Sequence, residues 1–424
     1  MRYPMKRLVT ILLLLMLVAL PARAQFAARP QEAAEPLPAD AASLAEARQE
    51  AWNAYRDALT EDPTLLAETA ANAMTEGEAT MRYTVQVIGD MPEDGYPLYI
   101  AMHGGGSGDT PAFNDEQWEE MQEYYSMALD CGVYVAVRGV RDTWDTHFNP
   151  ESYPLYDRLI RYMILTQGVD PNRVYLEGFS AGGDGVYAIS TRMPDRFAAA
   201  NMSSGHPNGV SLVNLYNLPI QLQAGEFDEE YDRHRITAEY GLKLDDLQAE
   251  NGGYEHRTLI HYDCGHNYDD YDTVPIPVMH DIAAWLNDGD RAHEDVDSYP
   301  PDYMDAFTRD PLPPKVIWDL STRADSRRTE TFYYLSAPYT TNQGTVTVTA
   351  DGDNRFAVET RDVNGEFSIL LNEEMVDFSR PVTFTVDGGE TSLTLTPDRA
   401  LLAATTADRG DPEYQFEAKV TFGE

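Results

Sequence analysis

The sequence predicts two successive folds: an α/β fold with a doubly wound, mostly parallel sheet, and then a small all-β sandwich domain. From Thr80 to about residue 290, short apolar strands alternate with helical segments, as in a parallel sheet covered on both faces. Beyond Val316 the apolar period changes to two, and turn pairs such as Asn364-Gly365 separate the strands. With 424 residues and 43% hydrophobic content, the chain is long enough for two packed cores.

Residues 1–24 have the pattern of a cleavable secretory signal. Basic residues precede an apolar run at residues 8–20, and Ala22-Arg23-Ala24 offers small side chains to a signal peptidase. The apolar run is shorter than the ~20 residues that span a bilayer. No cysteine follows it to carry a lipid. We therefore expect a periplasmic or secreted protein without a membrane anchor.

Between the signal and the first strand we expect a flexible lead and then helices. Residues 25–40 are rich in Pro, Ala and Glu and have no apolar period. Residues 41–79 carry apolar side chains at helical spacing, and Asp62 followed by Pro63 is typical of a helix N-terminus. We expect these helices to decorate the main domain.

The main domain is expected over residues 80–290. Strands are predicted at 81–88, 98–102, 133–137, 174–177, 197–202, 220–224 and 257–262, and helices at 116–129, 155–165, 185–190, 236–248 and 278–286. A polar, proline-rich linker at 291–315 precedes the sandwich domain at 316–424. The sandwich strands are predicted at 316–320, 331–335, 344–350, 355–359, 367–371, 382–386, 392–396 and 416–422.

The net charge and the cysteines limit the possible partners. The formal net charge is −40, so phosphate backbones and anionic membranes would be repelled, and we expect no nucleic-acid partner. Cys131 stands where a strand begins and Cys264 where another ends, at opposite edges of a parallel sheet. We expect both thiols to be free. The oligomeric state stays open.

A strand that leads directly into Gly178-Phe179-Ser180-Ala181-Gly182 suggests the chemistry. Gly-x-Ser-x-Gly between a buried strand and a helix is typical of a nucleophile elbow, in which the serine is held in a strained turn. Side chains at the two glycines would collide with neighbouring backbone. Ser180 is therefore the candidate nucleophile.

Acyl transfer also needs backbone donors for a developing oxyanion. The segment His103-Gly104-Gly105-Gly106-Ser107 follows an earlier strand, at the sheet edge where such donors belong. Without a β-carbon, Gly105 and Gly106 can bring their N–H groups close to a carbonyl oxygen, together with the amide of Ala181. His103 fits the loop scaffold better than it fits a general base.

The base and the acid are expected on later loops, because the chain order of such sites is Ser, acid, His. His266 follows the last predicted strand of the domain and is the candidate base. Asp228 stands four residues beyond the strand 220–224 and can orient the imidazole. Asp232 and Glu226 are the second and third choices for the acid.

With these motifs in this order, the chain resembles the α/β-hydrolase superfamily over roughly residues 80–422. Within it, the chain is similar to secreted bacterial esterases of the dienelactone-hydrolase and polyhydroxybutyrate-depolymerase-like group. It also resembles two-domain bacterial hydrolases in which a Gly-x-x-Asp-x-x-Tyr segment, here residues 225–231, precedes a β-sandwich. The resemblance implies ester hydrolysis by Ser180, Asp228 and His266. The serine nucleophile disfavours dienelactones, and we expect neither a cofactor nor a metal.

The connection at residues 203–218 is too short for a helical lid, which favours an open cleft and a large, polymeric or carbohydrate-linked ester. Short-chain esters also remain possible. For the candidate substrate contacts, loop packing is an equally good explanation. These candidates are His103, Trp144, His147 and His206.

Three alternatives stay open. A serine peptidase would use the same triad, and a carbohydrate-binding or adhesive protein could carry a degenerate hydrolase domain. A metal site could involve Asp269, Asp270 and Asp272, which lack the spacing of a calcium loop and fit a solvated acidic loop better.

Overall fold

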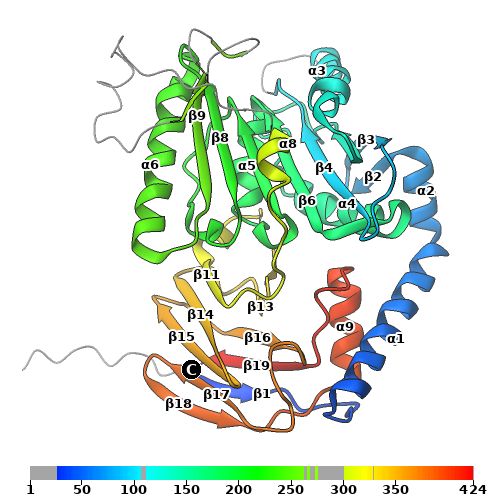
Figure 1. The fold of residues 1–424 in the computed structure, drawn as a ribbon, viewed down its shortest axis with the longest axis vertical. Helices are drawn as coiled ribbons and strands as arrows, with labels where there is room; N and C mark the ends of the chain where they lie inside the picture. The colour runs from blue at the N-terminus through cyan, green and yellow to red at the C-terminus, as the bar shows by residue number, and fades with distance from the viewer. Residues whose placement is uncertain are drawn as a thin grey trace, which may run out of the picture.

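The structure is a computed structural model that describes residues 26–106, 111–261, 265–267, 273–275, 300–327 and 329–423. An α/β body lies above a second body built mainly of strands (Figure 1). In the described part of the chain, a nine-stranded sheet with covering helices is followed by two five-stranded sheets. The predicted fold class is therefore confirmed.

The large sheet has the strand order β10-β9-β8-β7-β6-β4-β5-β3-β2. Its strands are β2 (Ala73–Glu76), β3 (Ala79–Ile88), β4 (Tyr96–Met102), β5 (Gly132–Val137), β6 (Val169–Phe179), β7 (Ala199–Ser203), β8 (Ile220–Gly225), β9 (His256–His261) and β10 (Thr273–Pro275). Strands β4 to β9 are mutually parallel, whereas the pairs β2–β3, β3–β5 and β9–β10 are antiparallel. The carboxyl ends of the parallel strands therefore share one edge, the upper one in Figure 1.

Helices cover both faces of this sheet, which is why its central strands read as continuous apolar runs. The helices are α2 (Pro63–Ala71), α3 (Pro111–Tyr124), α4 (Ser152–Gln167), α5 (Ala181–Ser190), α6 (Arg233–Asn251) and α8 (Pro300–Met304). In β4, Leu98 and Ile100 pack in one core with α4, α5 and α6, and Tyr99 and Ala101 pack in the other with α3 and α8. The helix expected at residues 278–286 lies outside the described residues.

The second body consists of two sheets packed face to face around one core. One sheet has the order β1-β19-β16-β13-β12 and the other β11-β14-β15-β17-β18. Their strands are β1 (Ala27–Pro30), β11 (Lys315–Asp319), β12 (Thr331–Phe332), β13 (Leu335–Ser336), β14 (Thr345–Gly352), β15 (Arg355–Arg361), β16 (Phe367–Leu371), β17 (Val382–Val386), β18 (Gly389–Leu393) and β19 (Ala418–Gly423). The rings of Phe384 and Phe422 meet between the sheets, with centroids 5.4 Å apart.

The second body is not purely β, which corrects the prediction. Helix α9 (Arg399–Arg409) covers one side of it and was missed. Its signals are present in the sequence: Asp398 accepts a hydrogen bond from the Ala400 amide at the N-terminus, and Gly410 ends the helix at φ 56°. The strand expected at 331–335 is interrupted by Tyr333, whose φ is 54°.

The start of the described chain is also not a flexible lead. Strand β1 pairs antiparallel with β19, the last strand of the chain, and Leu37 is buried in the core of the second body. The prediction for residues 25–40 was wrong because the partner that orders β1 lies almost 400 residues away, at Ala418–Gly423.

Helix α1 (Ala41–Thr60) belongs mainly to the second body, against the expectation that it decorates the α/β body. It runs beside α9 (Figure 1), and Leu44 and Ala47 enter the core of the second body. The next helix, α2, instead inserts Leu65 into the core of the α/β body. The chain therefore crosses between the two bodies near Asp62.

The described part of the predicted linker, residues 300–315, is packed rather than free. Tyr303 and Met304 of α8 are buried against the large sheet, and Arg309 is almost fully buried. The segment links the two bodies as a packed connection, in which Arg309 finds partners in both of them, Asp195 and Asp411.

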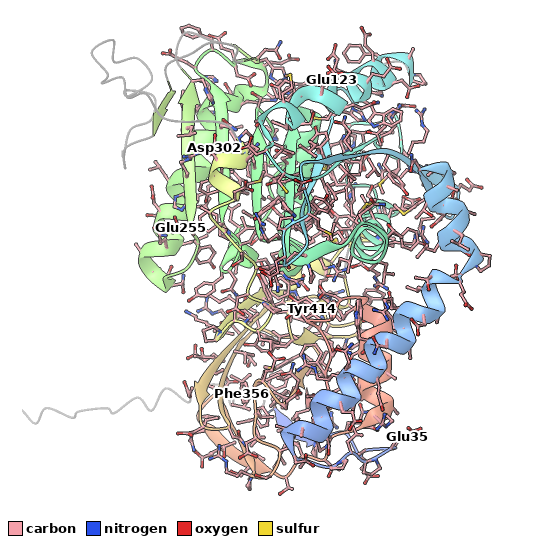
Figure 2. The ribbon with its side chains drawn as sticks, turned by 45° about the vertical axis from the view of Figure 1, so that its right-hand side comes forward. Glu35, Glu123, Glu255, Asp302, Phe356 and Tyr414 are labelled. Carbon is pink, nitrogen blue, oxygen red and sulfur yellow. The ribbon has the colours of Figure 1, made fainter. Side chains whose placement is uncertain are left out.

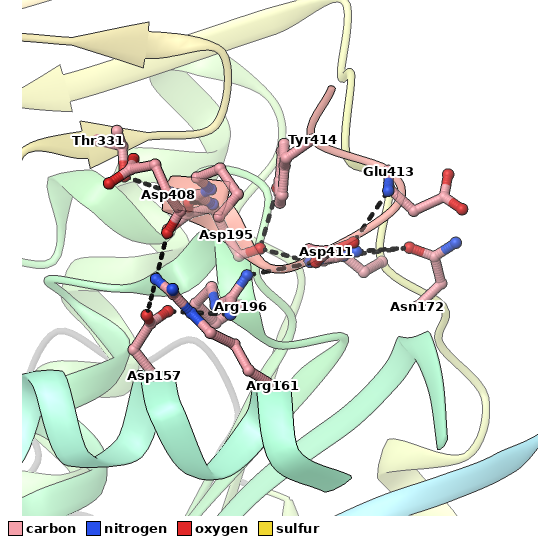
Figure 3. Close-up of polar contacts among 12 residues, drawn as sticks. Asp157, Arg161, Asn172, Asp195, Arg196, Thr331, Asp408, Asp411, Glu413 and Tyr414 are labelled. Atoms are coloured by element: carbon pink, nitrogen blue, oxygen red, sulfur yellow. Dashed lines mark hydrogen bonds and ion pairs between the residues drawn. The ribbon is translucent and has the colours of Figure 1, made fainter. Parts of the chain in front are cut away.

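Buried ion pairs join the two bodies (Figure 3). Arg309 Nη1 lies 2.8 Å from Asp411 Oδ2, which also contacts Arg196 Nη1 at 3.3 Å. Arg409 pairs with Asp195, whose backbone oxygen accepts a hydrogen bond from the Tyr414 hydroxyl at 2.9 Å. Figure 2 shows Tyr414 at this junction. These charges lie out of water, so each depends on its partners.

Asp411→Asn is expected to destabilise the protein by about 3–5 kcal/mol, because it leaves the buried guanidinium of Arg309 without its carboxylate partner and that of Arg196 with Asp157 alone. Burial alone would raise the pKa of Asp411, but Arg309 and Arg196 outweigh it and hold the pKa below its usual value. Chemical unfolding followed by far-UV circular dichroism measures the change.

The matched control is Arg355→Ala, which removes an exposed ion pair with Glu390 in the second body. It should cost less than about 1 kcal/mol. Equal losses in the two variants would contradict the role assigned to the buried pairs.

Candidate active site

The turn between β6 and α5 places Ser180 at the upper edge of the large sheet. Ser180 has φ 56° and ψ −117°, a backbone conformation that residues other than glycine rarely adopt. A β-carbon at Gly178 would lie 2.4 Å from the Gly182 oxygen, and one at Gly182 would lie 2.1 Å from the Met102 oxygen. Both glycines are therefore required by close backbone contacts, as the motif predicts.

Ser180, His266 and Asp228 form one chain of hydrogen bonds. His266 Nε2 lies 2.9 Å from Ser180 Oγ, and His266 Nδ1 lies 3.0 Å from Asp228 Oδ2. Asp228 is 1% exposed, whereas about a third of the His266 side chain, 34%, is exposed. With a neutral imidazole, the serine hydroxyl donates to Nε2 and Nδ1–H donates to the carboxylate. The structure thus brings the three predicted residues together.

The end of β8 and the start of α6 hold Asp228 in place. The Asp228 amide donates to Gly225 O at 3.2 Å, and the His234 amide donates to Asp228 O at the same distance. Arg233 Nη1 lies 3.6 Å from the second carboxylate oxygen. The carboxylate of Asp232, the second choice, instead pairs with Arg235 at 3.1 Å. Of the three carboxylates considered, Asp228 is the one paired with His266.

The loop after β7 supports the base. Ser204 Oγ donates to the backbone oxygen of His266 at 3.0 Å. The His206 amide donates to Asp184 Oδ1 at 2.6 Å, and a ring nitrogen of His206 accepts from the Asn208 amide at 3.0 Å. His206 does not line the hollow beside Ser180. Its groups hold this loop against the first turn of α5, and its predicted contact with substrate stays a prediction.

The glycine loop after β4 lies next to Ser180. Gly105 and Gly106 have φ +95° and +111°, which residues with a side chain rarely adopt. A β-carbon at Gly104 would lie 3.3 Å from Ser180 Cβ. The Gly106 amide donates to Asn114 Oδ1 at 2.9 Å. The prediction that Gly106 supplies an oxyanion donor is wrong for this structure, because its amide already donates to Asn114 of α3. Gly105 and Ala181 remain the candidate donors.

His103 and His147 are buried scaffold, which corrects their assignment as substrate contacts. His103 Nδ1 lies 2.5 Å from Gly104 O, and His103 Nε2 accepts from the Gly139 amide at 3.0 Å. His147 Nε2 donates to His103 O at 2.9 Å. Burial lowers the pKa of His103 to about 4 and that of His147 well below its usual value. Both rings are therefore neutral supports of the glycine loop.

A hollow of about 640 Å³ opens beside Ser180 and His266. Its aromatic lining comprises Phe113, Tyr124, Phe179 and Tyr231, and its polar lining includes Gln117, Glu120, Glu230 and Arg233. Sequence reasoning missed these residues. The signal was the spacing of Phe113, Gln117, Glu120 and Tyr124, which puts them on one face of the helix that follows the glycine loop.

Trp144 lies on the other side of the glycine loop. A β-carbon at Gly106 would lie 3.4 Å from Thr143 O and 3.7 Å from Trp144 Cα. Trp144 is 50% exposed and packs edge-on against Phe148. Its predicted contact with substrate stays a prediction.

No protein-family model matches the chain, and no curated protein matches it. Among solved structures, it is similar to a thermostable esterase, with 24% identity, 45% of this chain and 53% of that chain covered, and a TM-score of 0.35. A poly(3-hydroxybutyrate) depolymerase from Bordetella parapertussis has 16% identity, 49% and 90% coverage, and a TM-score of 0.35. A phosphonylated esterase from Thermogutta terrifontis has 15% identity, 46% and 84% coverage, and a TM-score of 0.36.

These structures are distant, and the first match spans about half of the esterase concerned, 53%. Identities of this size concern the fold alone.

Several expectations fall on residues outside the described ranges: the signal at 1–24, Cys264, and Asp269, Asp270 and Asp272. Cys131 is a free thiol near Asp90 O, at 3.3 Å. Within the described residues, no cluster of three or more His, Cys, Asp or Glu could hold a metal ion. No helix in these ranges is both long enough and apolar enough to cross a membrane.

Stability should fall as the pH drops from about 6.5 to about 4, partly through His103. The unfolded chain protonates this ring near pH 6.5, whereas the folded protein does so only near pH 4, so the unfolded state binds more protons between these values. Between pH 7 and about pH 5, the free energy of unfolding should therefore fall by about 2 kcal/mol less in His103→Gln than in the wild type.

Urea unfolding at the two pH values measures this effect. Glutamine can still accept from the Gly139 amide, so the variant is expected to fold. An unchanged pH dependence would show that His103 is charged or accessible in the folded protein.

Proposed function

We propose that this protein is a serine hydrolase that cleaves carboxylic esters, with Ser180 as nucleophile, His266 as general base and Asp228 as the orienting acid. The observation that carries the proposal is the hydrogen-bond chain Asp228–His266–Ser180, with distances of 3.0 and 2.9 Å, which ends on a strained serine beside a hollow. A serine in an ordinary turn would need neither the buried carboxylate nor the imidazole.

The reaction follows from this geometry. His266 Nε2 takes the proton of the Ser180 hydroxyl as Oγ attacks the ester carbonyl, and Asp228 stabilises the imidazolium that forms. The amides of Gly105 and Ala181 stabilise the oxyanion, and Ala181 is the first residue of α5, where the helix dipole is positive. The imidazolium then protonates the leaving alcohol, and water hydrolyses the acyl-enzyme by the same proton transfers.

The walls of the hollow support an uncharged ester rather than an anionic one. Phe113 and Tyr231 are 41% and 67% exposed and can contact a sugar or aryl ring, and the Arg233 guanidinium covers one face of Tyr231, with Cζ 4.9 Å from the ring centroid. Glu120 and Glu230 outnumber Arg233 in the described lining and would repel a negative group. Between β7 and β8 the chain forms only the short helix η3 (Val213–Leu215) and no lid. We propose carbohydrate-linked, polymeric or short-chain esters as substrates. The pattern of residues 1–24 supports a periplasmic or secreted location.

Ser180→Ala is expected to abolish hydrolysis of p-nitrophenyl acetate and covalent labelling by a fluorophosphonate. Its melting temperature should stay within a few degrees of the wild type, because alanine keeps the β-carbon. Ser379→Ala, at an exposed turn of the second body, is the matched control and should keep full activity. Wild-type turnover in the Ser180 variant would refute the proposed nucleophile.

Asp228→Asn is expected to lower kcat by about 10⁴-fold, because an amide favours the wrong imidazole tautomer. Initial rates normalised to folded protein measure this effect.

A comparison with matched p-nitroanilides separates an esterase from a peptidase: equal turnover of anilides and esters would favour the peptidase.

A further inference from the structure

One side chain of the second body reaches a loop of the α/β body that supports the glycine loop. Arg327 follows the short helix η5 (Leu320–Arg323). Its Nε donates to Phe148 O at 2.8 Å, and its Nη2 donates to Asp145 Oδ2 at 2.6 Å. The two side chains are mostly buried, with 24% and 12% of their surfaces exposed. The pair is a charge-assisted contact between the two bodies.

The contacted segment, residues 139–149, is an irregular loop organised around Asp145. Asp145 Oδ1 accepts from Thr143 Oγ1 at 2.8 Å, and Asp145 O accepts from Asn149 Nδ2 at 2.8 Å. Arg327 binds the other carboxylate oxygen, Oδ2. The loop therefore depends on a residue of the second body to complete its central hydrogen bonds.

The same loop fixes the glycine loop at Ser180 from two directions. On one side, Gly139 donates to His103 Nε2 at 3.0 Å and His147 donates to His103 O at 2.9 Å. On the other side, Asp142 Oδ1 accepts from Asn114 Nδ2 at 2.7 Å, and Asn114 Oδ1 holds the Gly106 amide at 2.9 Å. A shift of residues 139–149 would therefore move the backbone proposed to bind the oxyanion.

Arg327 is itself held in position by the end of α5. Its amide donates to Asp325 Oδ1 at 2.8 Å, and Asp325 Oδ2 pairs with Arg192 at 3.4 Å. Thr329 Oγ1 donates to Arg192 O at 3.2 Å. Asp325 and Thr329 thus anchor the chain on the α/β body on both sides of the arginine.

We propose that Arg327 is a positioning residue for hydrolysis at Ser180, through which the second body fixes loop 139–149 and the glycine loop that it supports. This inference rests on the proposed function. A misplacement of about 1 Å that is caused by a change far from the reacting groups can lower the rate about 10²-fold, so a contact outside the reacting groups can act on kcat. The second body then acts on the reaction without touching the substrate.

Point variants test this better than a truncation, because β1 and α1 of the second body come from the start of the chain. The variants are Arg327→Ala, Arg327→Lys, Asp145→Asn and the double variant Arg327→Ala/Asp145→Asn. Arg355→Ala, at an exposed ion pair of the same body, is the control. Active sites are counted in each preparation by fluorophosphonate titration, so that a loss of folded protein is not read as a loss of rate.

For Arg327→Ala we expect kcat per active site for p-nitrophenyl acetate to fall about tenfold while KM stays within about twofold, because the transition state is affected more than the ground state. The affinity for a trifluoromethyl ketone, whose adduct carries the oxyanion, should fall by a similar factor. Arg327→Lys should lie in between, because one ammonium cannot replace both contacts. The double variant should be no worse than Arg327→Ala.

Hydrogen exchange gives a readout without turnover: residues 139–149 should exchange faster in Arg327→Ala and at the wild-type rate in Arg355→Ala. Unchanged kcat and ketone affinity per active site in Arg327→Ala would overturn the inference, as would an equal loss in Arg355→Ala. A wild-type protein that is neither labelled by fluorophosphonate nor active on esters would instead refute the proposed function.

Discussion

Ser180 is held at φ 56° and ψ −117° because β6 and α5 meet where no β-carbon fits at Gly178 or Gly182. The packing of a buried strand against a buried helix offsets the cost of this conformation. It projects the hydroxyl beyond the edge of the sheet, where the loops after β8 and β9 bring Asp228 and His266. The site therefore depends on one strained turn, and the neighbouring loops are arranged around it.

The buried polar groups near this turn act mainly as supports. His103 and His147 are neutral at physiological pH because burial lowers their pKa values, and they connect the glycine loop to the loop after β5. Histidines close to a serine nucleophile are easily read as reactive or substrate-binding groups. Here their ring nitrogens are used within the protein, and His266 is the ring that reaches Ser180.

The two bodies are more closely connected than a catalytic domain with an appended module. The first and last described strands, β1 and β19, pair in the same sheet, and buried ion pairs around Asp195 and Asp411 join the two bodies. The second body lies at the opposite end of the large sheet from the carboxyl ends of its parallel strands (Figure 1), and Ser180 directly follows the carboxyl end of β6. It contacts two loops that support the site: Arg327 binds Asp145 in the loop after β5, and Asp319 accepts a hydrogen bond from Ser211 in the loop after β7.

The sequence by itself determined the fold class, the order of most strands and helices, and the three residues that meet at the site. Each of these leaves a local signal: apolar period, a strand–turn–helix motif, or a position after a particular strand. Only the tertiary structure decided the partner of β1, the acceptor for the Gly106 amide, the burial of His103, and the contact of Arg327 with Asp145. These features join residues far apart in the chain, and composition or spacing around either partner carries no information about the other.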